Sequence, residues 1–176
     1  MACNIEIKAR LLDRGKVESL AMPLADSGPH LIEQQDVFFP CEGARLKLRI
    51  LAPDRGELIR YERPDSAGAR ASSYSIAHTY DPEVLLEILE KTLGRMGVVR
   101  KSRTLYLIGQ TRVHLDRVEG LGDFVELEVV LRPGQDESEG HRIAQDLMAK
   151  LGIEAGQLVA EAYVDLIKAA HISGSH

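Results

Sequence analysis

Polar and apolar residues alternate along much of this chain, and the alternation predicts β-strands that each carry one charged face. In residues 4–12, for example, Asn4, Glu6, Lys8 and Arg10 alternate with aliphatic side chains. A strand points successive side chains to opposite faces, so these four polar groups share one face. The same pattern predicts strands over 4–12, 45–51, 57–63, 98–107, 111–118 and 124–131.

Helical spacing of apolar residues is confined to a few segments. The clearest helix begins at Asp81-Pro82-Glu83, where Asp81 is a suitable N-cap and Pro82 a suitable first residue, and it ends at Gly94 or Gly97. Further helices are predicted over 138–151 and 157–170, with a weaker one over 14–25. Together the elements indicate an α+β protein dominated by antiparallel sheet.

The length of 176 residues favours a single domain, predicted here as residues 1–170, with a flexible tail over 171–176. Residues 63–70 are the best candidate for a mobile loop. Two cysteines do not make a disulfide framework, and charged residues near the N-terminus interrupt any signal-peptide pattern. With no apolar run of membrane-spanning length, we expect a cytoplasmic protein without a membrane partner.

Charge is mildly acidic in total but unevenly placed. The chain has 22 Lys and Arg against 27 Asp and Glu, which argues against a nucleic-acid-binding surface. Basic pairs nevertheless occur within single strands, as in Lys47/Arg49 and Lys101/Arg103, whereas Glu126 and Glu128 form an acidic pair. Basic groups that grip phosphates and carboxylates that hold a hard cation are what a polyphosphate–metal complex requires. We therefore expect the charged faces to line the interior of a closed sheet.

An ordered set of short motifs resembles one known family. The N-terminal strand, with Glu6 and Lys8, is similar to the E-x-E-x-K strand of the CYTH superfamily, the triphosphate tunnel metalloenzymes. Residues 114–122, which read H-L-D-x-V-E-G-L-G and precede E-L-E at 126–128, resemble the class IV adenylate cyclase branch. The other matching segments, in family order, are 35–39, 46–49, 61–65, 101–103, 112–116 and 162–166.

The resemblance implies an antiparallel eight-stranded β-barrel, or tunnel, with helices outside and a triphosphate inside. It also implies Mg²⁺ or Mn²⁺ as the cofactor. Transferred residue by residue, it assigns metal binding to Glu6, Glu126, Glu128 and Asp116, and phosphate binding to Lys8, Lys47, Arg49, Lys101, Arg103 and Arg112. Glu6 or Asp116 is the expected catalytic group that positions an attacking water.

Two positions depart from the family pattern. Asn4 stands where the first Glu of E-x-E-x-K is expected, and its amide oxygen can bind a hard cation but adds no negative charge. Glu62 lies near a position that is basic in many relatives. His114 has two readings, as an acid or base or as a hydrogen-bonded lumen residue, and Tyr163 is expected to serve in packing.

The sequence is compatible with three functions. Carboxylates that hold a metal and cations that bind phosphate are sufficient for hydrolysis, which favours a metal-dependent triphosphatase acting on inorganic triphosphate or a nucleoside triphosphate. A class IV adenylate cyclase that converts ATP to cyclic AMP and pyrophosphate is the main alternative. The second alternative, motivated by Asn4, is a non-catalytic module that binds polyphosphate or nucleotide. The partner in each case is a small triphosphate-containing molecule, and a homodimer is a further expectation.

Overall fold

The computed structural model describes residues 2–62 and 68–173 and shows a closed antiparallel barrel. Around the barrel the strand order is β1-β5-β4-β3-β2-β6-β7-β8, and every neighbouring pair is antiparallel. The predicted eight-stranded tunnel is therefore confirmed. The strands are β1 Ala2–Arg10, β2 Ser27–Phe39, β3 Arg45–Ala52, β4 Arg55–Glu62, β5 Arg70–Thr79, β6 Gly97–Ile108, β7 Thr111–Val118 and β8 Gly122–Val130.

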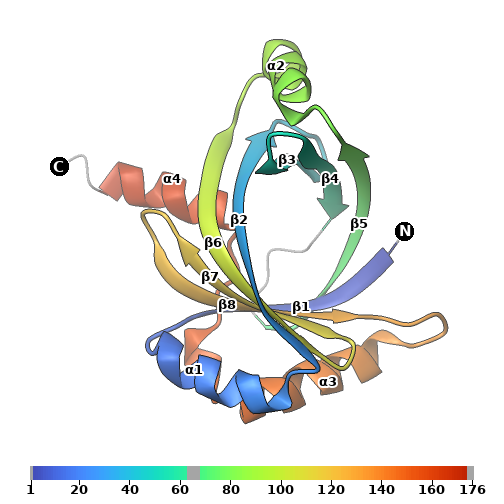
Figure 1. The fold of residues 1–176 in the computed structure, drawn as a ribbon, viewed down its shortest axis with the longest axis vertical. Coiled ribbons are helices and arrows are strands. Elements are labelled where there is room, and N and C mark those ends of the chain that lie inside the picture. The colour runs from blue at the N-terminus through green and yellow to red at the C-terminus, as the bar shows by residue number, and fades with distance from the viewer. Residues whose placement is uncertain (1, 63–67, 174–176) are drawn as a thin grey trace.

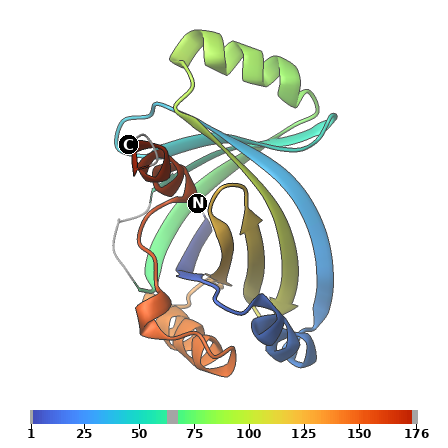
Figure 2. The ribbon, with the colours of Figure 1, turned by 90° about the vertical axis from the view of Figure 1, so that its left-hand side faces the viewer.

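Helices cover the outside of the barrel. Figures 1 and 2 show α1 and α3 beneath the β1, β7 and β8 side, α2 on the opposite side, and α4 beside β6. A short 3₁₀ turn follows α1, and another precedes α4. The helices are α1 Arg14–Ala21, α2 Pro82–Leu93, α3 Glu137–Lys150 and α4 Tyr163–Ser173, and the 3₁₀ turns are Met22–Leu24 and Ala155–Gln157.

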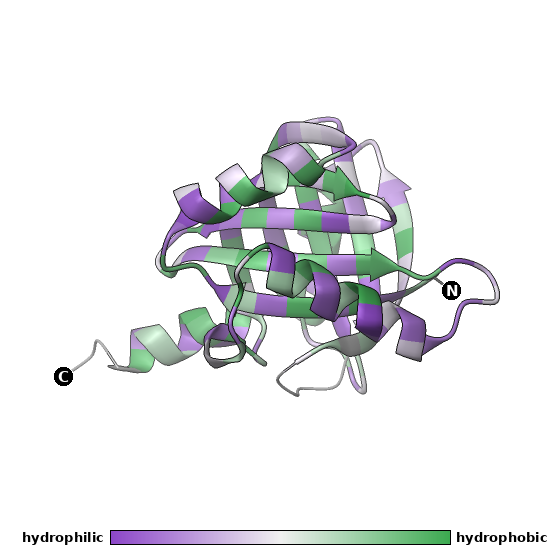
Figure 3. Cartoon of the chain, turned by 90° about the horizontal axis from the view of Figure 1, so that it is seen from below, coloured by the Kyte–Doolittle hydropathy of each residue, from purple (hydrophilic) through white to green (hydrophobic). Residues whose placement is uncertain are grey.

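The apolar strand faces point outward and are buried by these helices. Ile5, Val113 and Leu127 are fully buried in the cluster formed with α1 and α3. Burial of such a side chain contributes about 1.5–3 kcal/mol. Gly140 lets α3 approach closely, because a Cβ there would come within 2.6 Å of Ile5. Seen from below, the strands alternate between hydrophobic and hydrophilic residues (Figure 3), which leaves the hydrophilic face for the lumen.

The best-predicted helix is also confirmed at both ends. Asp81 Oδ1 accepts a hydrogen bond from the Val84 amide at 3.3 Å, and Gly94 ends the helix with φ of 75°. None of the helices in the described part of the chain has the length and apolar character needed to cross a membrane.

The structure differs from the sequence-based elements in four places. The helix predicted over 14–25 ends at Ala21 and is followed by the 3₁₀ turn Met22–Leu24. Strands β2 and β5 were not predicted from periodicity, because their polar residues outnumber the aliphatic ones. The helix predicted over 157–170 begins only at Tyr163, since Leu158 pairs with Ala9 of β1 and extends the chain there. Residues 171–173, predicted as tail, continue α4. The rest of that tail, 174–176, and most of the predicted loop, 63–67, lie outside the described residues.

Candidate functional site

The barrel encloses a cavity of about 680 Å³ that is lined mainly by alternate residues of the strands. The polar strand faces expected to line an interior do so. Of the residues expected to form a site, only Asp116 is outside the cavity lining; Glu6, Lys8, Lys47, Arg49, Lys101, Arg103, Arg112, Glu126 and Glu128 are all part of it. The sequence therefore selected side chains that the fold gathers into one space.

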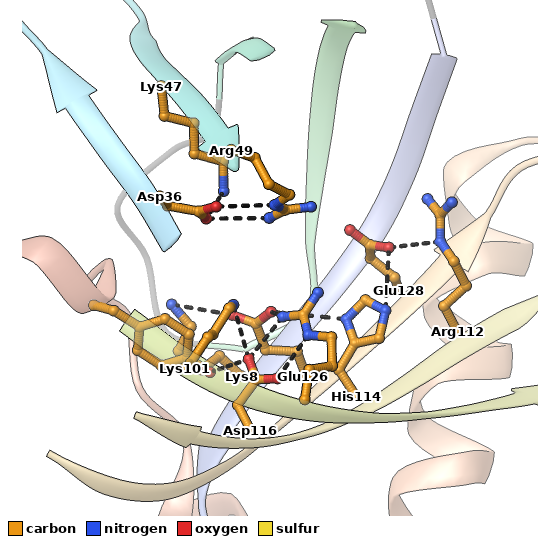
Figure 4. Close-up of polar contacts among 12 residues, drawn as sticks. Lys8, Asp36, Lys47, Arg49, Lys101, Arg112, His114, Asp116, Glu126 and Glu128 are labelled. Carbon is orange, nitrogen blue, oxygen red and sulfur yellow. Dashed lines mark hydrogen bonds and ion pairs between the residues drawn. The ribbon is translucent and has the colours of Figure 1, made fainter. Parts of the chain in front are cut away.

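Strand register determines which charges meet. Across β1 and β8, Lys8 lies opposite Glu126 and Glu6 lies opposite Glu128. Directly opposed residues of an antiparallel pair have Cβ atoms about 4.5–5.5 Å apart. Glu126 Oε2 accepts a hydrogen bond from Arg103 Nη2 at 2.8 Å, and Lys8 Nζ lies 3.4 Å from its other oxygen. The acidic strand is thus interleaved with the basic residues (Figure 4).

Asp116 is fully buried and binds two of these cations, Lys101 and Arg103. Its carboxylate accepts hydrogen bonds from Lys101 Nζ at 2.9 Å, from Arg103 Nε at 2.6 Å and from Tyr163 Oη at 3.1 Å. Burial alone would raise the pKa of Asp116, but Arg103 and Lys101 outweigh it and hold the pKa below its ordinary value. The side chain is 0% exposed and its oxygens face these protein donors; its role as a metal ligand stays a prediction.

Asp36 of β2, which was not among the residues predicted from the sequence, accepts hydrogen bonds from two cations in the same way. Its carboxylate accepts hydrogen bonds from Lys47 Nζ at 2.7 Å and from Arg49 Nε at 2.9 Å. Burial would raise the pKa of Asp36, but Arg49 and Lys47 lower it below the ordinary value. The available signal was alternation in 34–38, where Gln34, Asp36 and Phe38 face the lumen.

Glu128 and His114 lie beside Glu126 in the lumen. Arg112 Nε donates to Glu128 Oε2 at 2.7 Å. Burial would raise the pKa of Glu128, but His114, Arg112 and Arg103 lower it below the ordinary value. Burial and the charge of Arg103 lower the pKa of His114, although Glu126 and Glu128 oppose them. At neutral pH the imidazole is therefore uncharged and the carboxylate is ionised.

Tyr163 closes one end of the cavity from the start of α4. Its ring lies under Lys8 Nζ at 4.1 Å and under Lys101 Nζ at 4.8 Å from the ring centre. Burial and Asp116 raise the pKa of Tyr163 well above its ordinary value, which keeps the phenol as a donor. Beyond the packing role expected from sequence, Tyr163 therefore contacts three charged groups of the site.

Three aliphatic side chains also line the cavity, on the side away from Tyr163. Each of them lies two residues from a polar lining residue of the same strand, and all three are displaced in the same direction along the barrel. They are Leu105 next to Arg103, Leu51 next to Arg49 and Ile32 next to Gln34. These aliphatic groups continue the cavity away from Tyr163. The charged lining continues there as well, with Arg55 on β4 and Arg112 on β7.

The donors present suit a hard divalent cation. Glu6, Glu126 and Glu128 offer carboxylate oxygens on two paired strands, which is the ligand chemistry of Mg²⁺ and Mn²⁺. Among the described side chains, no three His, Cys, Asp or Glu already converge as a metal-binding group. Glu126 and Glu128 are instead engaged by arginines, so an ion would have to replace these cations.

The two departures from the family pattern have different consequences. Glu62 pairs with Arg60 at 2.8 Å, with both side chains about half exposed, and it is not part of the cavity lining. It therefore lies apart from the residues expected to bind phosphate. Asn4 is buried, and within the described part of the chain its Oδ1 has no hydrogen-bond partner. Asn4, like Glu62, is not part of the cavity lining.

If Lys47 binds phosphate as expected, its pKa should make that binding sensitive to pH. Burial lowers the pKa of Lys47 to about 8; the Asp36 ion pair opposes this, while Arg49 and Lys101 add to it. Above this pH the free protein must take up a proton to present a charged Lys47, so the wild-type Kd for triphosphate should rise by up to about tenfold per pH unit. Lys47→Arg, which stays charged, should remove this rise in calorimetric titrations. Titration of the ligand affects both proteins equally and cancels in the ratio of the wild-type Kd to the Lys47→Arg Kd. If this ratio does not change from pH 7 to 9.5, Lys47 is not the group responsible.

Comparison with known proteins identifies the family. The CYTH domain model matches residues 2–163. Adenylate cyclase CyaB of Aeromonas hydrophila is 27% identical over 173 residues, covering 91% of this chain and 86% of that protein. The PH1012 protein of Pyrococcus horikoshii OT3 superimposes with a TM-score of 0.82 at 25% identity, covering 93% of this chain and 98% of the other. HpAC1 from Hippeastrum superimposes with a TM-score of 0.63 at 18% identity, covering 98% and 97%. With its closed barrel and its charged lumen, the chain belongs to the CYTH family, as its strand motifs indicated.

Proposed function

We propose that this protein is a divalent-metal-dependent enzyme that acts on a triphosphate in its lumen, with Mg²⁺ or Mn²⁺ as the ion and hydrolysis of the terminal phosphoanhydride as the favoured reaction. The observation that carries the proposal is the pairing of lumen cations with lumen carboxylates. A fold shared with HpAC1, which is described as having a dominant triphosphatase activity, also supports it.

The ion pairs suit the joint binding of an anion and a cation. Arg103 pairs with Glu126 and Arg112 pairs with Glu128. Breaking the first pair without replacement leaves the charge of the buried Arg103 uncompensated. A metal–triphosphate complex supplies phosphate oxygens to the arginines and a cation to the carboxylates in the same step. Neither component alone satisfies both partners.

The residues divide the work as follows. Lys8, Lys47, Arg49, Lys101, Arg103 and Arg112 bind phosphate oxygens and hold the chain of phosphates in one orientation. Glu6, Glu126 and Glu128 hold the ion, which neutralises charge on the phosphate oxygens when bound. Glu6, which lines the cavity opposite Glu128, positions a water and accepts its proton as the water oxygen bonds to the terminal phosphorus and diphosphate leaves. Asp116 positions Lys101 and Arg103 from behind.

Cyclisation of ATP is the second candidate, and the size and lining of the cavity favour it. A cavity of about 680 Å³ lies within the range of about 300–1,000 Å³ typical of sites for drug-sized molecules. Three aliphatic side chains of its lining, Ile32, Leu51 and Leu105, offer contacts to a nucleoside that inorganic triphosphate would not use. Similarity to the Aeromonas hydrophila cyclase points the same way.

Product analysis separates the three functions. The protein is incubated with inorganic triphosphate or with ATP, in Mg²⁺ or Mn²⁺, and phosphate, pyrophosphate and cyclic AMP are measured. Hydrolysis predicts metal-dependent release of phosphate from both substrates. Formation of cyclic AMP together with pyrophosphate would show that the protein is a cyclase and not a triphosphatase. Tight binding without any metal-dependent product would reject both enzymes in favour of a binding module.

A further inference from the structure

His114 is a lumen side chain that the ion-pair scheme leaves without a function. It lines the cavity and is only 4% exposed. Within the described part of the chain, its Nδ1 atom has no hydrogen-bond partner. A buried ring nitrogen that makes no hydrogen bond costs free energy, so this placement indicates a partner that is supplied from the cavity.

The ring lies between the two carboxylates of β8. His114 Nδ1 is 3.9 Å from Glu126 Oε2, and His114 Nε2 is 4.0 Å from Glu128 Oε2 (Figure 4). Both separations are too long for hydrogen bonds. Two neighbouring donors on one octahedral ion lie roughly 3 Å apart, because each bond is about 2.1 Å long. A shift of about 1 Å would therefore bring Nδ1 and Glu126 onto a shared ion.

The other ring nitrogen is placed to fix the orientation of the imidazole. A metal-binding histidine commonly donates its second N–H to a carboxylate, which fixes the tautomer. Nε2 of His114 faces Glu128, so this carboxylate can accept that hydrogen bond once it is released from Arg112. Glu126 must likewise exchange Arg103 for the ion, and a bound phosphate gives Arg103 a new partner.

We propose that His114 Nδ1 is a nitrogen ligand to the divalent ion held by Glu126, and that this nitrogen makes the site prefer Mn²⁺ to Mg²⁺. The inference rests on the proposed function and deepens it. Imidazole nitrogen binds first-row transition ions well, whereas Mg²⁺ strongly favours oxygen donors. A site of glutamates alone would discriminate less between the two ions.

Pulsed electron paramagnetic resonance tests the nitrogen ligand directly. The wild-type protein is loaded with Mn²⁺ and a methylene-bridged triphosphate analogue that resists hydrolysis. We expect echo modulation from a coordinated ¹⁴N nucleus, which should change to the ¹⁵N pattern when the protein is made with ¹⁵N-histidine. This readout requires neither turnover nor a variant that has to fold.

A matched pair of variants assigns the nitrogen. His114→Gln should abolish the modulation, whereas His78→Gln should retain it. His78 also lines the cavity, but its ring is 72% exposed and pairs at 3.8 Å with Glu57 on the other side of the lumen. In calorimetric titrations with the analogue, His114→Gln should weaken Mn²⁺ binding by about tenfold or more and Mg²⁺ binding by less than twofold.

These measurements test the role of His114 separately from the metal-dependent function. If Mn²⁺ binds to the wild type without nitrogen modulation, the role of His114 is wrong and the metal-dependent function stands. Equal loss of Mn²⁺ and Mg²⁺ affinity in His114→Gln would also overturn the role. If Mn²⁺ does not bind in the presence of the analogue, the proposed function itself fails.

Discussion

Glu128→Gln should lower metal-dependent turnover by about 100-fold or more while leaving the barrel folded. The substitution keeps the size of the side chain and removes the negative charge that the proposed ion requires. Charge stabilisation by a bound metal is worth several kcal/mol in a transition state, and each 1.36 kcal/mol corresponds to a tenfold change in rate. Steady-state rates over a range of Mg²⁺ and Mn²⁺ concentrations measure the effect.

Glu128 is the better test position of the two acidic residues on β8. Its ion pair is with Arg112, whose side chain is 38% exposed, so losing the pair leaves that arginine within reach of water. Glu126 contacts Arg103 and Lys8, which are nearly fully buried, and its replacement would also affect folding. Position 128 therefore separates metal binding from stability.

Glu62→Gln is the matched control for this substitution. Glu62 pairs with Arg60 on the exposed side of β4, and an exposed ion pair contributes only about 0–1 kcal/mol. This variant should keep wild-type turnover and wild-type stability. Full activity of Glu128→Gln at every metal concentration would show that the ion is held elsewhere.

Asp116→Asn should destabilise the protein by about 3–5 kcal/mol, the typical cost of removing one partner from a buried ion pair. The carboxylate accepts hydrogen bonds from Lys101, Arg103 and Tyr163. An asparagine amide cannot match this arrangement, because its NH₂ group faces cationic donors. Denaturant unfolding at neutral pH measures the loss.

The destabilisation should depend on pH with a defined sign. The pKa of Asp116 is lower in the folded protein than its ordinary value of about 3.9. Its contribution to stability is therefore present above about pH 4 and is lost as the pH falls through the lowered pKa. The difference between wild type and Asp116→Asn should shrink in acid.

Kinetics distinguish a positioning role from a catalytic one. If Asp116 acts by orienting Lys101 and Arg103, its loss should raise KM for triphosphate together with the loss of stability. Tyr163→Phe, which removes one hydrogen bond to Asp116, should cost about 1 kcal/mol and change KM in the same direction. A variant of unchanged stability and KM but collapsed kcat would instead make Asp116 the catalytic group that sequence reasoning expected.

Sequence reasoning was most successful where a side-chain position depends only on local periodicity. The two-residue period of a strand places Lys101 with Arg103, and Glu126 with Glu128, on single faces. The fold, the family and the charged faces that line the cavity followed from that period and from the order of the motifs. Strands β2 and β5 were not predicted because they lack a regular aliphatic face. Their formation depends on pairing with the neighbouring strands.

The pairing of charges was decided by the tertiary structure. Asp116 and Glu126 both come from charged strand faces, yet one is enclosed by donors and the other opens onto the cavity. Periodicity assigns a face to each residue, but the register between strands and the packing of α4 determine the partners. The sequence by itself therefore determined that this acidic protein has strands with concentrated positive charge. Closure of the barrel, which brings residues distant along the chain within a few ångströms, decided which carboxylates are enclosed by cations and which open onto the cavity.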